Sequence, residues 1–389
     1  MVAPTSCFAQ VLSLVSRGQF ERAVVDWQAE KASKGFSCWG QFVAMTFSQM
    51  GAANSLREIC GGLATAMGKL RHLGLSGAPA RSTLAYANAH RPWQLYPSVF
   101  EHLLDSCRGE AAHHRRKFRF KNPLYSLDAS VIDLCLAQYD WARFRRAKGA
   151  IKLHLQLDHQ GYLPCWALVT EGKMHEIKAA WQVSLPPGAI VAMDKAFTDY
   201  RLFAHWTQSG VYFVTRMKNN AIYEVVEDRP LPAGGRILAD QVIRLTGTGA
   251  AQKCPHDLRR IVVWDERQQR EIVLLTNHLG FAASTVATIY KERWQIEIFF
   301  KALKHDLKVK TFVGTSANAV KIQIWTALIV MLLLKYLQLR STYGWSLSNL
   351  AAMLRFNLLS YRDLWAWLDA PWNTPILEPT QHQLSFLTG

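Results

Sequence analysis

The spacing of hydrophobic and polar positions changes near residue 124. From there to about residue 170 the two kinds of side chain alternate, most regularly in the segment 150–158, "AIKLHLQLD". A period of two is typical of β-strands with one buried face. Short apolar segments at 188–193, 211–218 and 270–278 predict further strands. The segments 175–184 and 199–210 predict helices. The pattern indicates a mixed sheet flanked by helices.

Other patterns divide the chain into regions. Residues 1–106 show helical periodicity, as does the C-terminal region 315–389, and a basic linker occupies 107–123. Residues 124–314 are expected to form the domain that contains the sheet. Within that domain, Gly- and Pro-bearing turns separate short β-rich segments at about 218–276, which predicts a β-rich insertion. We therefore expect an α/β domain preceded by an all-helical N-terminal domain.

Two short helices are predicted inside the N-terminal region. Ser55 and Glu58 have the spacing of a capping box, which starts a helix. The segment 80–93 predicts a second helix, which Pro92 ends. The connection between them carries Gly and Pro. Such a pair is either a DNA-reading helix-turn-helix or an ordinary part of a helical domain, and the sequence leaves both interpretations open.

Charge and cysteine content narrow the classes of function. The 389 residues include 45 Lys and Arg against 29 Asp and Glu, a formal charge of +16. This excess favours a polyanionic partner, most often nucleic acid. The seven cysteines form no CxxC pair, which argues against a zinc site and fits a reducing cytoplasm. The N-terminus lacks a signal-peptide pattern, and the most apolar run, 324–334, is shorter than a membrane span, so we expect no membrane partner.

A basic and aromatic segment, "HHRRKFRFKNP", covers residues 113–123. Lys117, Arg119 and Lys121 alternate with phenylalanines, so an extended segment would have one basic face and one aromatic face. The segment is either a solvated linker or a strap that follows phosphates. Its local charge favours the strap, with Arg119 and Lys121 as candidate DNA contacts.

The segment 290–304, "YKERWQIEIFFKALK", combines charge with aromatic rings. At 3.6 residues per turn, Tyr290, Arg293, Glu297 and Lys304 fall in a stripe roughly 60° wide, beside an apolar arc that would face a core. The stripe is either a solvated face with helix-supporting ion pairs or a carboxylate flanked by three groups that bind phosphate. Glu292 falls outside the stripe and is a poor candidate for chemistry.

Carboxylates from separate elements complete a candidate site. Asp128 lies within the first predicted strand, and Asp194 ends a short apolar strand, where open α/β sheets place their chemistry. Together with Glu297 they could hold two divalent ions about 4 Å apart, for which magnesium is suited. Asp133 is five residues from Asp128, so it would point to the opposite face of the strand.

These residues resemble the DDE transposases of bacterial insertion sequences, in the group with a Tyr-Arg-Glu-Lys signature (the insertion sequence four family). The signature spacing of two, three and six intervening residues is matched by Tyr290, Arg293, Glu297 and Lys304. Further matches are "LDASVIDLCL" around Asp128, "KGAIKLH", "EGKMHE", "VYFVTRMK", "LTNH" and "GTSANAVKIQIW". The N-terminal "FSCWGQFVAMTFSQMGAANSLREI" is similar to the helical domain that precedes the catalytic one in a subgroup. The resemblance covers almost the whole chain.

The resemblance implies an RNase H-like fold with the β-rich insertion between Asp194 and Glu297. It implies a Mg²⁺-dependent enzyme that holds two ions on Asp128, Asp194 and Glu297, with Mn²⁺ as a substitute. The enzyme would cut DNA at the ends of its element and join the ends to target DNA, with or without a hairpin intermediate. Arg293, Lys304 and Tyr290 would hold phosphates. The partners would be double-stranded DNA and, in the DNA complex, a second copy of the chain. The enzyme would work in the bacterial cytoplasm, on the nucleoid when bound.

One departure from the family pattern concerns the residues after Asp194. The family often has Asp-Arg-Gly-Tyr, whereas this chain has Asp194 followed by Lys195, Ala196 and Phe197. Lys195, Lys301 and Trp264 are further candidate DNA contacts, Trp264 as a platform for an unpaired base. Two other classes of function stay open: a catalytically silent DNA-binding protein derived from a transposase, and a structure-specific nuclease of similar fold.

Overall fold

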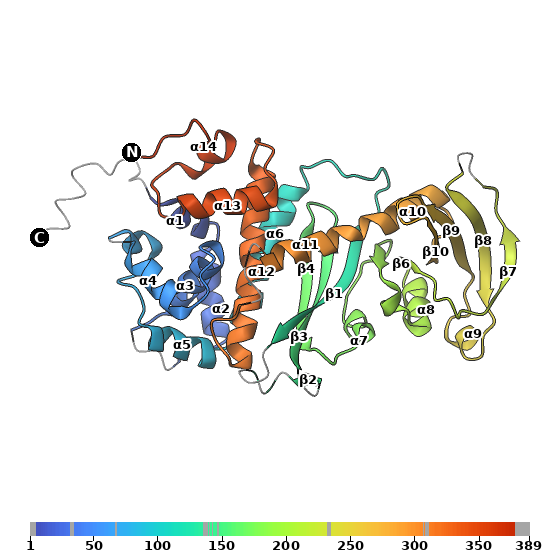
Figure 1. Ribbon diagram of the computed structural model, residues 1–389, viewed down its shortest axis with the longest axis horizontal. Helices are drawn as coiled ribbons and strands as arrows, with labels where there is room; N and C mark the ends of the chain where they lie inside the picture. Colours follow the sequence, from blue (N-terminus) through green and yellow to red (C-terminus); the bar gives the residue numbers. More distant parts are fainter. Residues whose placement is uncertain are drawn as a thin grey trace, which may run out of the picture. The chain divides into compact units, whose positions relative to one another are not determined.

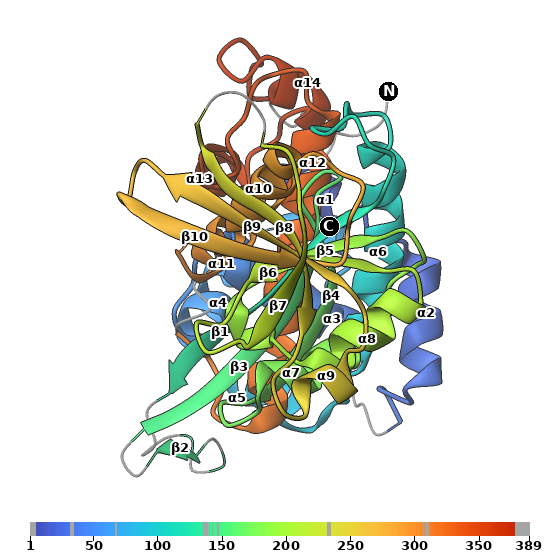
Figure 2. The same cartoon turned by 90° about the vertical axis from the view of Figure 1, so that its right-hand side faces the viewer.

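The computed structural model describes residues 5–31, 35–66, 68–134, 139, 141, 143–145, 148–231, 235–305, 307 and 311–377. These residues form two compact units, whose helices and strands are labelled where there is room in Figures 1 and 2. The helical unit contains the described residues up to Arg115, Ile132–Gly149 and those from Lys301 onward. The sheet unit contains Arg116–Val131 and Ala150–Phe300. Cys135 and positions 232–234 of the predicted insertion lie outside the described residues.

The sheet unit is built around one large mixed sheet, which confirms the predicted α/β class. Its first half has the order β4-β3-β1-β5-β6, in which β3 and β4 are antiparallel while β1, β5 and β6 are parallel. The strands are β1 (Leu124–Leu134), β3 (Lys148–Asp158), β4 (Leu163–Glu171), β5 (Ile190–Met193) and β6 (Tyr212–Arg216), and β2 (Arg143–Arg145) pairs with the start of β3.

The β-rich segments after β6 continue the same sheet. β10 (Arg270–Thr276) is antiparallel to β6 on one side and to β9 (Leu258–Asp265) on the other. β8 (Ile237–Leu245) and β7 (Tyr223–Asp228) follow outward, with the short helix α9 (Ala250–Lys253) in the connection between β8 and β9. Figure 2 shows the twist that accumulates across these strands. The predicted insertion is therefore an extension of the central sheet.

Strand β5 is apolar throughout because both of its faces are buried. Ile190 and Ala192 belong to a core under α10 (Ala283–Glu292). Val191 and Met193 belong to a second core on the opposite face, beneath α7 (Glu176–Ala180) and α8 (Tyr200–Gln208). The alternation of faces along a strand explains why this segment shows no polar position before Asp194.

The helical unit holds the helices of both chain ends. Its N-terminal elements are α1 (Cys7–Leu12), α2 (Arg17–Asp26), α3 (Cys38–Met50), α4 (Leu56–Ala64), η1 (Lys69–Leu73), α5 (Arg81–His90) and α6 (Leu95–Ala111). Its C-terminal elements are α12 (Ala317–Arg340), α13 (Leu347–Asn357) and α14 (Leu364–Asp369), and α11 (Trp294–His305) begins in the sheet unit. Helix α12 contacts α3, α5, α6 and α13.

Helix α12 is longer than the apolar run at 324–334 suggests. Its 24 residues are long and apolar enough to span a membrane by length and composition alone. However, 83% of its most apolar window is buried inside the protein. This burial fits the predicted role of a core helix, which passes the same test of hydropathy.

The predicted helix start at Ser55 is confirmed. Ser55 Oγ accepts a hydrogen bond from the Glu58 N–H at 3.2 Å and donates to Glu58 Oε1 at 3.1 Å. The second predicted helix is α5, which ends at His90, two residues before Pro92. The connection between α4 and α5 contains the 3₁₀ helix η1 and is longer than the three to four residues of a helix-turn-helix turn.

Candidate active site

The two candidate aspartates stand at the same level of neighbouring parallel strands. The register pairs Leu127 of β1 with Met193 of β5, so Asp128 and Asp194 come next on each strand. Asp128 shares a strand face with Leu124, which packs in the core beneath α10. Adjacent strands lie about 4.8 Å apart, so the backbone alone brings the two acids close together.

Arg216 extends this row onto a third strand. It is the last residue of β6, two positions beyond Val214, which pairs with Ala192. Its Nη2 lies 3.2 Å from Oδ2 of Asp194, and both side chains are 29% exposed. The sequence did not single out Arg216, although it lies within the strand-like "VYFVTRMK" segment, two residues after Val214 and therefore on the same strand face.

Arg293 and Glu297 enter the site from the helical layer. The sequence predicted one helix over 290–304, but α10 ends at Glu292 and α11 begins at Trp294. The Arg293 N–H donates to the Tyr290 carbonyl at 3.2 Å, and the Ile296 N–H donates to the Arg293 carbonyl at 3.1 Å. These i to i−3 bonds form a tight turn of the 3₁₀ type that separates two helices. The single continuous helix was therefore a wrong prediction.

Three members of the predicted signature nevertheless lie together. Arg293 Nη2 is 2.7 Å from Oε1 of Glu297, and Arg293 Nη1 is 3.5 Å from Oδ2 of Asp128. The guanidinium also lies 5.7 Å from the ring centre of Tyr290. Lys304 stands further along α11, in the part of the chain that belongs to the helical unit. The site thus gathers three acids around two arginines.

The carboxylates influence one another electrostatically. The pKa of Asp128 is raised from 3.8 to about 6, mainly by burial, with smaller contributions from the negative charges of Glu297 and Asp194. The Ala129 N–H, which donates to Asp128 Oδ1 at 2.8 Å, and the Arg293 charge lower this pKa, but burial prevails. A cation near Asp128 would favour the ionised form that a metal ligand needs.

The donor set suits a hard divalent cation. Asp128, Asp194 and Glu297 supply carboxylate oxygens from three separate elements, and oxygen ligands are those preferred by magnesium and manganese. Among the described residues, no group of three or more His, Cys, Asp or Glu side chains is close enough to enclose an ion. Arg293 contacts two of the acids, Asp128 and Glu297, and Arg216 contacts the third.

The basic strap at 113–123 has the two faces that its alternation predicted. Arg119 and Lys121 are exposed, whereas Phe118 and Phe120 are half-buried against the core beneath α10. The two rings stack with centres 4.8 Å apart, and Phe120 stacks on Phe281 at 5.0 Å. The aromatic face therefore anchors the segment to the sheet unit and leaves the two candidate DNA contacts in solvent.

The other candidate DNA contacts lie on three different elements outside the basic strap. Lys195 is exposed on η3 (Lys195–Phe197), directly after Asp194. Trp264 is half-buried near the end of β9, where it pairs with Glu271 of β10. Lys301 is exposed on the part of α11 that lies in the helical unit.

The sequence made Glu292 a poor candidate for chemistry but did not reveal its contacts. It is 7% exposed and makes specific contacts within the sheet unit. Its Oε1 lies 2.5 Å from Lys117 Nζ of the basic strap, and its Oε2 accepts a hydrogen bond from Tyr162 at 3.3 Å. Helical angles could not reveal this, because both partners come from distant parts of the sequence. The position next to Arg293 gives Glu292 a structural role beside the site.

Comparisons with known proteins identify the family of the chain. A family model described as "Transposase DDE domain" matches residues 119–333, and a second, described as a domain of unknown function (DUF4372), matches residues 4–76. The protein y4zB of Sinorhizobium fredii, whose name designates a transposase, is 29% identical over 286 residues, which is 72% of this chain and 77% of that protein. A protein of Geobacillus stearothermophilus, named as the probable transposase of the insertion sequence element IS5377, is 26% identical over 71% of this chain and 72% of its own length.

A solved structure also aligns with the chain. It is the cryo-EM structure of the piggyBac transposase synaptic complex with hairpin DNA, with 9% sequence identity and a TM-score of 0.45 over 98% of this chain and 84% of that one. The DDE model matches more than half of the chain, and curated relatives are named as transposases of insertion sequences. The protein therefore belongs to the transposase DDE domain family and is a transposase.

Proposed function

We propose that this transposase cuts DNA at the ends of its insertion sequence and joins those ends to target DNA by metal-dependent phosphoryl transfer. The catalytic residues are Asp128, Asp194 and Glu297. The observation that supports the proposal is the position of Asp128, within β1, beside Asp194, which directly follows the carboxyl end of the parallel strand β5; Glu297 is linked to Asp128 through Arg293. Open α/β sheets place their chemistry at this end.

Divalent ions of the kind used by this family would be held by the three carboxylates. We infer two Mg²⁺ ions, with Mn²⁺ as a substitute. When bound, the metal supplies Lewis-acid stabilisation of charge on the reacting phosphate and lowers the pKa of a nucleophilic hydroxyl. Asp128 must be ionised to serve as a ligand, and its neighbour Arg293 favours the ionised form.

The remaining signature residues orient the DNA backbone. Arg293 and Lys304 would neutralise phosphates, and the Tyr290 hydroxyl would donate a hydrogen bond to one. Phosphoryl transfer depends mainly on positioning and charge neutralisation, which fixed cations provide. Lys195, Lys301, Arg119 and Lys121 would extend the contact along the backbone, and Trp264 would stack on an unpaired base. A hairpin intermediate is compatible with this arrangement.

We also infer the fold class and the domain boundaries. The strand order β4-β3-β1-β5-β6, with β1, β5 and β6 parallel, supports an RNase H-like catalytic domain over residues 124–314. The helices of residues 1–106 support an N-terminal domain that binds the element ends, followed by a linker at 107–123 and a helical region at 315–389. We infer that the enzyme acts on double-stranded DNA in the cytoplasm and pairs with a second copy in the DNA complex.

The test compares isosteric variants of the acids in an assay with the element's own ends. Asp128→Asn, Asp194→Asn and Glu297→Gln should each abolish nicking and strand transfer, yet bind end DNA as the parent does. Asp133→Asn is the matched control, because Asp133 is an exposed acid on the same strand. Retained cleavage by any of the three variants would remove that residue from the site. Cut products without joined products would indicate a nuclease.

A further inference from the structure

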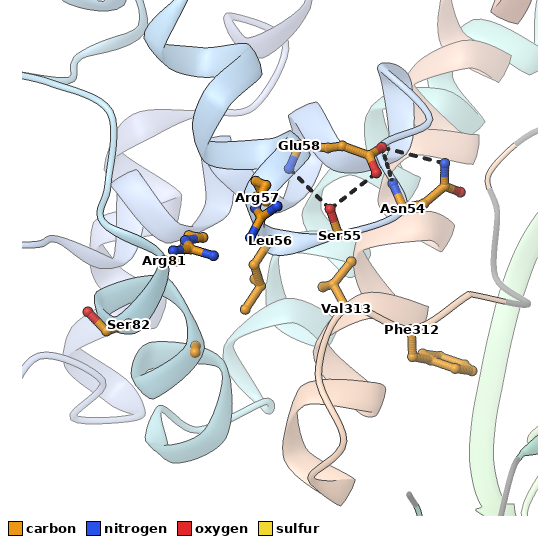
Figure 3. A pocket seen from close by; sticks show the side chains of 10 residues that line it. Asn54, Ser55, Leu56, Arg57, Glu58, Arg81, Ser82, Phe312 and Val313 are labelled. Atoms are coloured by element: carbon orange, nitrogen blue, oxygen red, sulfur yellow. Dashed lines mark hydrogen bonds between the residues drawn. The ribbon is translucent and has the colours of Figure 1, made fainter.

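A concave surface in the helical unit lies between α4, α5 and the segment before α12. The cavity has a volume of about 730 Å³ and is lined by ten residues, Asn54, Ser55, Leu56, Arg57, Glu58, Arg81, Ser82, Ala85, Phe312 and Val313. Figure 3 shows these side chains and the elements from which they come. The volume is too large for one inorganic ion and lies in the range of sites that hold an organic group.

The charged groups at this cavity are strongly unbalanced. Arg57 and Arg81 are both exposed, and among the described residues neither forms an ion pair with a carboxylate. Residues 51–100 contain five Lys and Arg but only one Asp or Glu, which is Glu58. Two arginines without acidic partners on facing elements are a common feature of surfaces that bind phosphate.

The one acid that lines the cavity, Glu58, already accepts hydrogen bonds from neighbouring protein groups. Glu58 Oε2 accepts a hydrogen bond from the Asn54 N–H at 2.9 Å, and its Oε1 accepts one from Ser55 Oγ at 3.1 Å. These bonds lower the pKa of Glu58, the Asn54 N–H most of all. The dashed lines in Figure 3 mark this capping network. Glu58 therefore helps to cap the start of α4 and, among the described residues, forms no ion pair with Arg57 or Arg81.

The rest of the lining is apolar or carries hydroxyls. Leu56, Phe312 and Val313 are half-buried, so they expose part of their apolar surface to the cavity. Ser82 adds an exposed hydroxyl beside Arg81. Guanidinium groups beside apolar contact area match the alternation of charged phosphates and apolar deoxyribose faces along a DNA strand.

We propose that this cavity binds the sugar-phosphate backbone of duplex DNA, with Arg57 and Arg81 on successive phosphates. The site lies wholly within the helical unit, so it anchors DNA through a surface that contains none of the catalytic carboxylates. It deepens the proposed function by naming where the N-terminal helices grip the element end, and it rests on that function only in requiring that the transposase binds DNA. Contacts to phosphates fix the register of the duplex without reading its sequence.

The experiment measures the salt dependence of end-DNA binding by the full-length protein. Arg57→Ala and Arg81→Ala should each lower the slope of log affinity against log salt by about 1, and the double variant by about 2. The loss in affinity should be similar for element ends and random duplexes. Arg22→Ala is the matched control, since Arg22 is an exposed arginine on α2 of the same unit. Thermal midpoints equal to that of the parent would show that the variants fold.

A second variant tests the sign of the effect. Glu58→Gln keeps a capping side chain at the same position of α4 but removes the negative charge, so it should bind DNA slightly more tightly than the parent. Slopes for Arg57→Ala and Arg81→Ala equal to that of Arg22→Ala would overturn the proposal. A loss confined to element ends would also overturn it, because it would indicate base reading. Either result leaves the test of the catalytic acids unaffected, since these variants retain Asp128, Asp194 and Glu297.

Discussion

Arg216 and Asp194 form an ion pair between the ends of two neighbouring parallel strands, with Nη2 and Oδ2 3.2 Å apart. The other carboxylate oxygen of Asp194 accepts a hydrogen bond from the Ala196 N–H at 3.1 Å. Both oxygens are therefore oriented by the protein. Family members often have Arg directly after this aspartate, whereas this chain has Lys195. The ion pair with β6 explains how Asp194 is braced without that arginine.

We predict that Arg216→Ala slows cleavage by about 10²-fold while end binding stays close to that of the parent. Arg216→Lys should recover only part of the rate, because lysine keeps the charge but lacks the planar fork. The concentration of Mg²⁺ that gives half-maximal cleavage should also rise, since Asp194 loses its orientation. Arg201→Ala, at an exposed arginine on the nearby α8, is the control and should change neither quantity. Equal effects at the two positions would show that Arg216 contributes only surface charge.

Metal binding and cleavage should weaken as the pH falls below about 6. The pKa of Asp128 is raised from 3.8 to about 6, so its carboxyl group becomes protonated as the pH falls through about 6. The protonated carboxyl group cannot bind metal. Arg293 lowers this pKa, so Arg293→Ala should move the midpoint to higher pH. Calorimetric titration with Mn²⁺ at pH 5, 6 and 7 provides a readout independent of turnover. An affinity unchanged from pH 5 to 7 would contradict the assignment of Asp128.

Glu292→Ala should lower the free energy of unfolding by about 1–3 kcal/mol, because the substitution removes the buried partner of Lys117 and Tyr162. The Lys117 side chain is 54% exposed and regains water, which keeps the loss below that of a fully buried pair. Chemical denaturation measures the change. Glu266→Ala breaks an exposed pair with Arg236 and should cost less than about 1 kcal/mol. If both variants lose the same stability, the contacts of Glu292 are no stronger than those on the surface.

His154 should make the protein sensitive to acid. This side chain is fully buried, and burial lowers its pKa from 6.5 to about 4, with a smaller contribution from Lys152. The folded state therefore prefers neutral His154, and this preference contributes up to about 3 kcal/mol above pH 6.5 that is lost as the pH falls towards 4. Unfolding free energies of His154→Gln should depend less on pH over that window. His175→Gln, at an exposed histidine, should keep the parent's pH dependence.

The parts of the site that follow local pattern could be predicted from sequence. Asp194 ends a short apolar run, and this run marks a strand buried on both faces whose carboxyl end is a place for chemistry. The alternation around Phe118 and Phe120 was likewise sufficient to assign the two faces of the strap. In each case the spacing of apolar residues in the sequence shows directly which faces of the segment are buried.

Other features depend on contacts that local pattern does not contain. The ion pair of Arg216 requires the register between β5 and β6, which is set by packing on both faces of the sheet. The turn at Arg293 has no glycine or proline to mark it, so the sequence favoured one helix. Helical angles placed Glu292 outside the stripe but could not reveal that Lys117 and Tyr162 contact it from distant segments.

The pairing of β10 with both β6 and β9 has a consequence for how the chain is synthesised. Strand β6 is complete at Arg216, but its second neighbour, β10, begins only at Arg270. Until the ribosome has made the intervening residues, β6 is an open edge with unpaired backbone groups, which is a template for association with other nascent chains. A copy of the element truncated within that interval would encode a protein in which β6 has no strand to pair with on its second edge. We expect such products to aggregate rather than to accumulate as soluble DNA-binding competitors of the full-length enzyme.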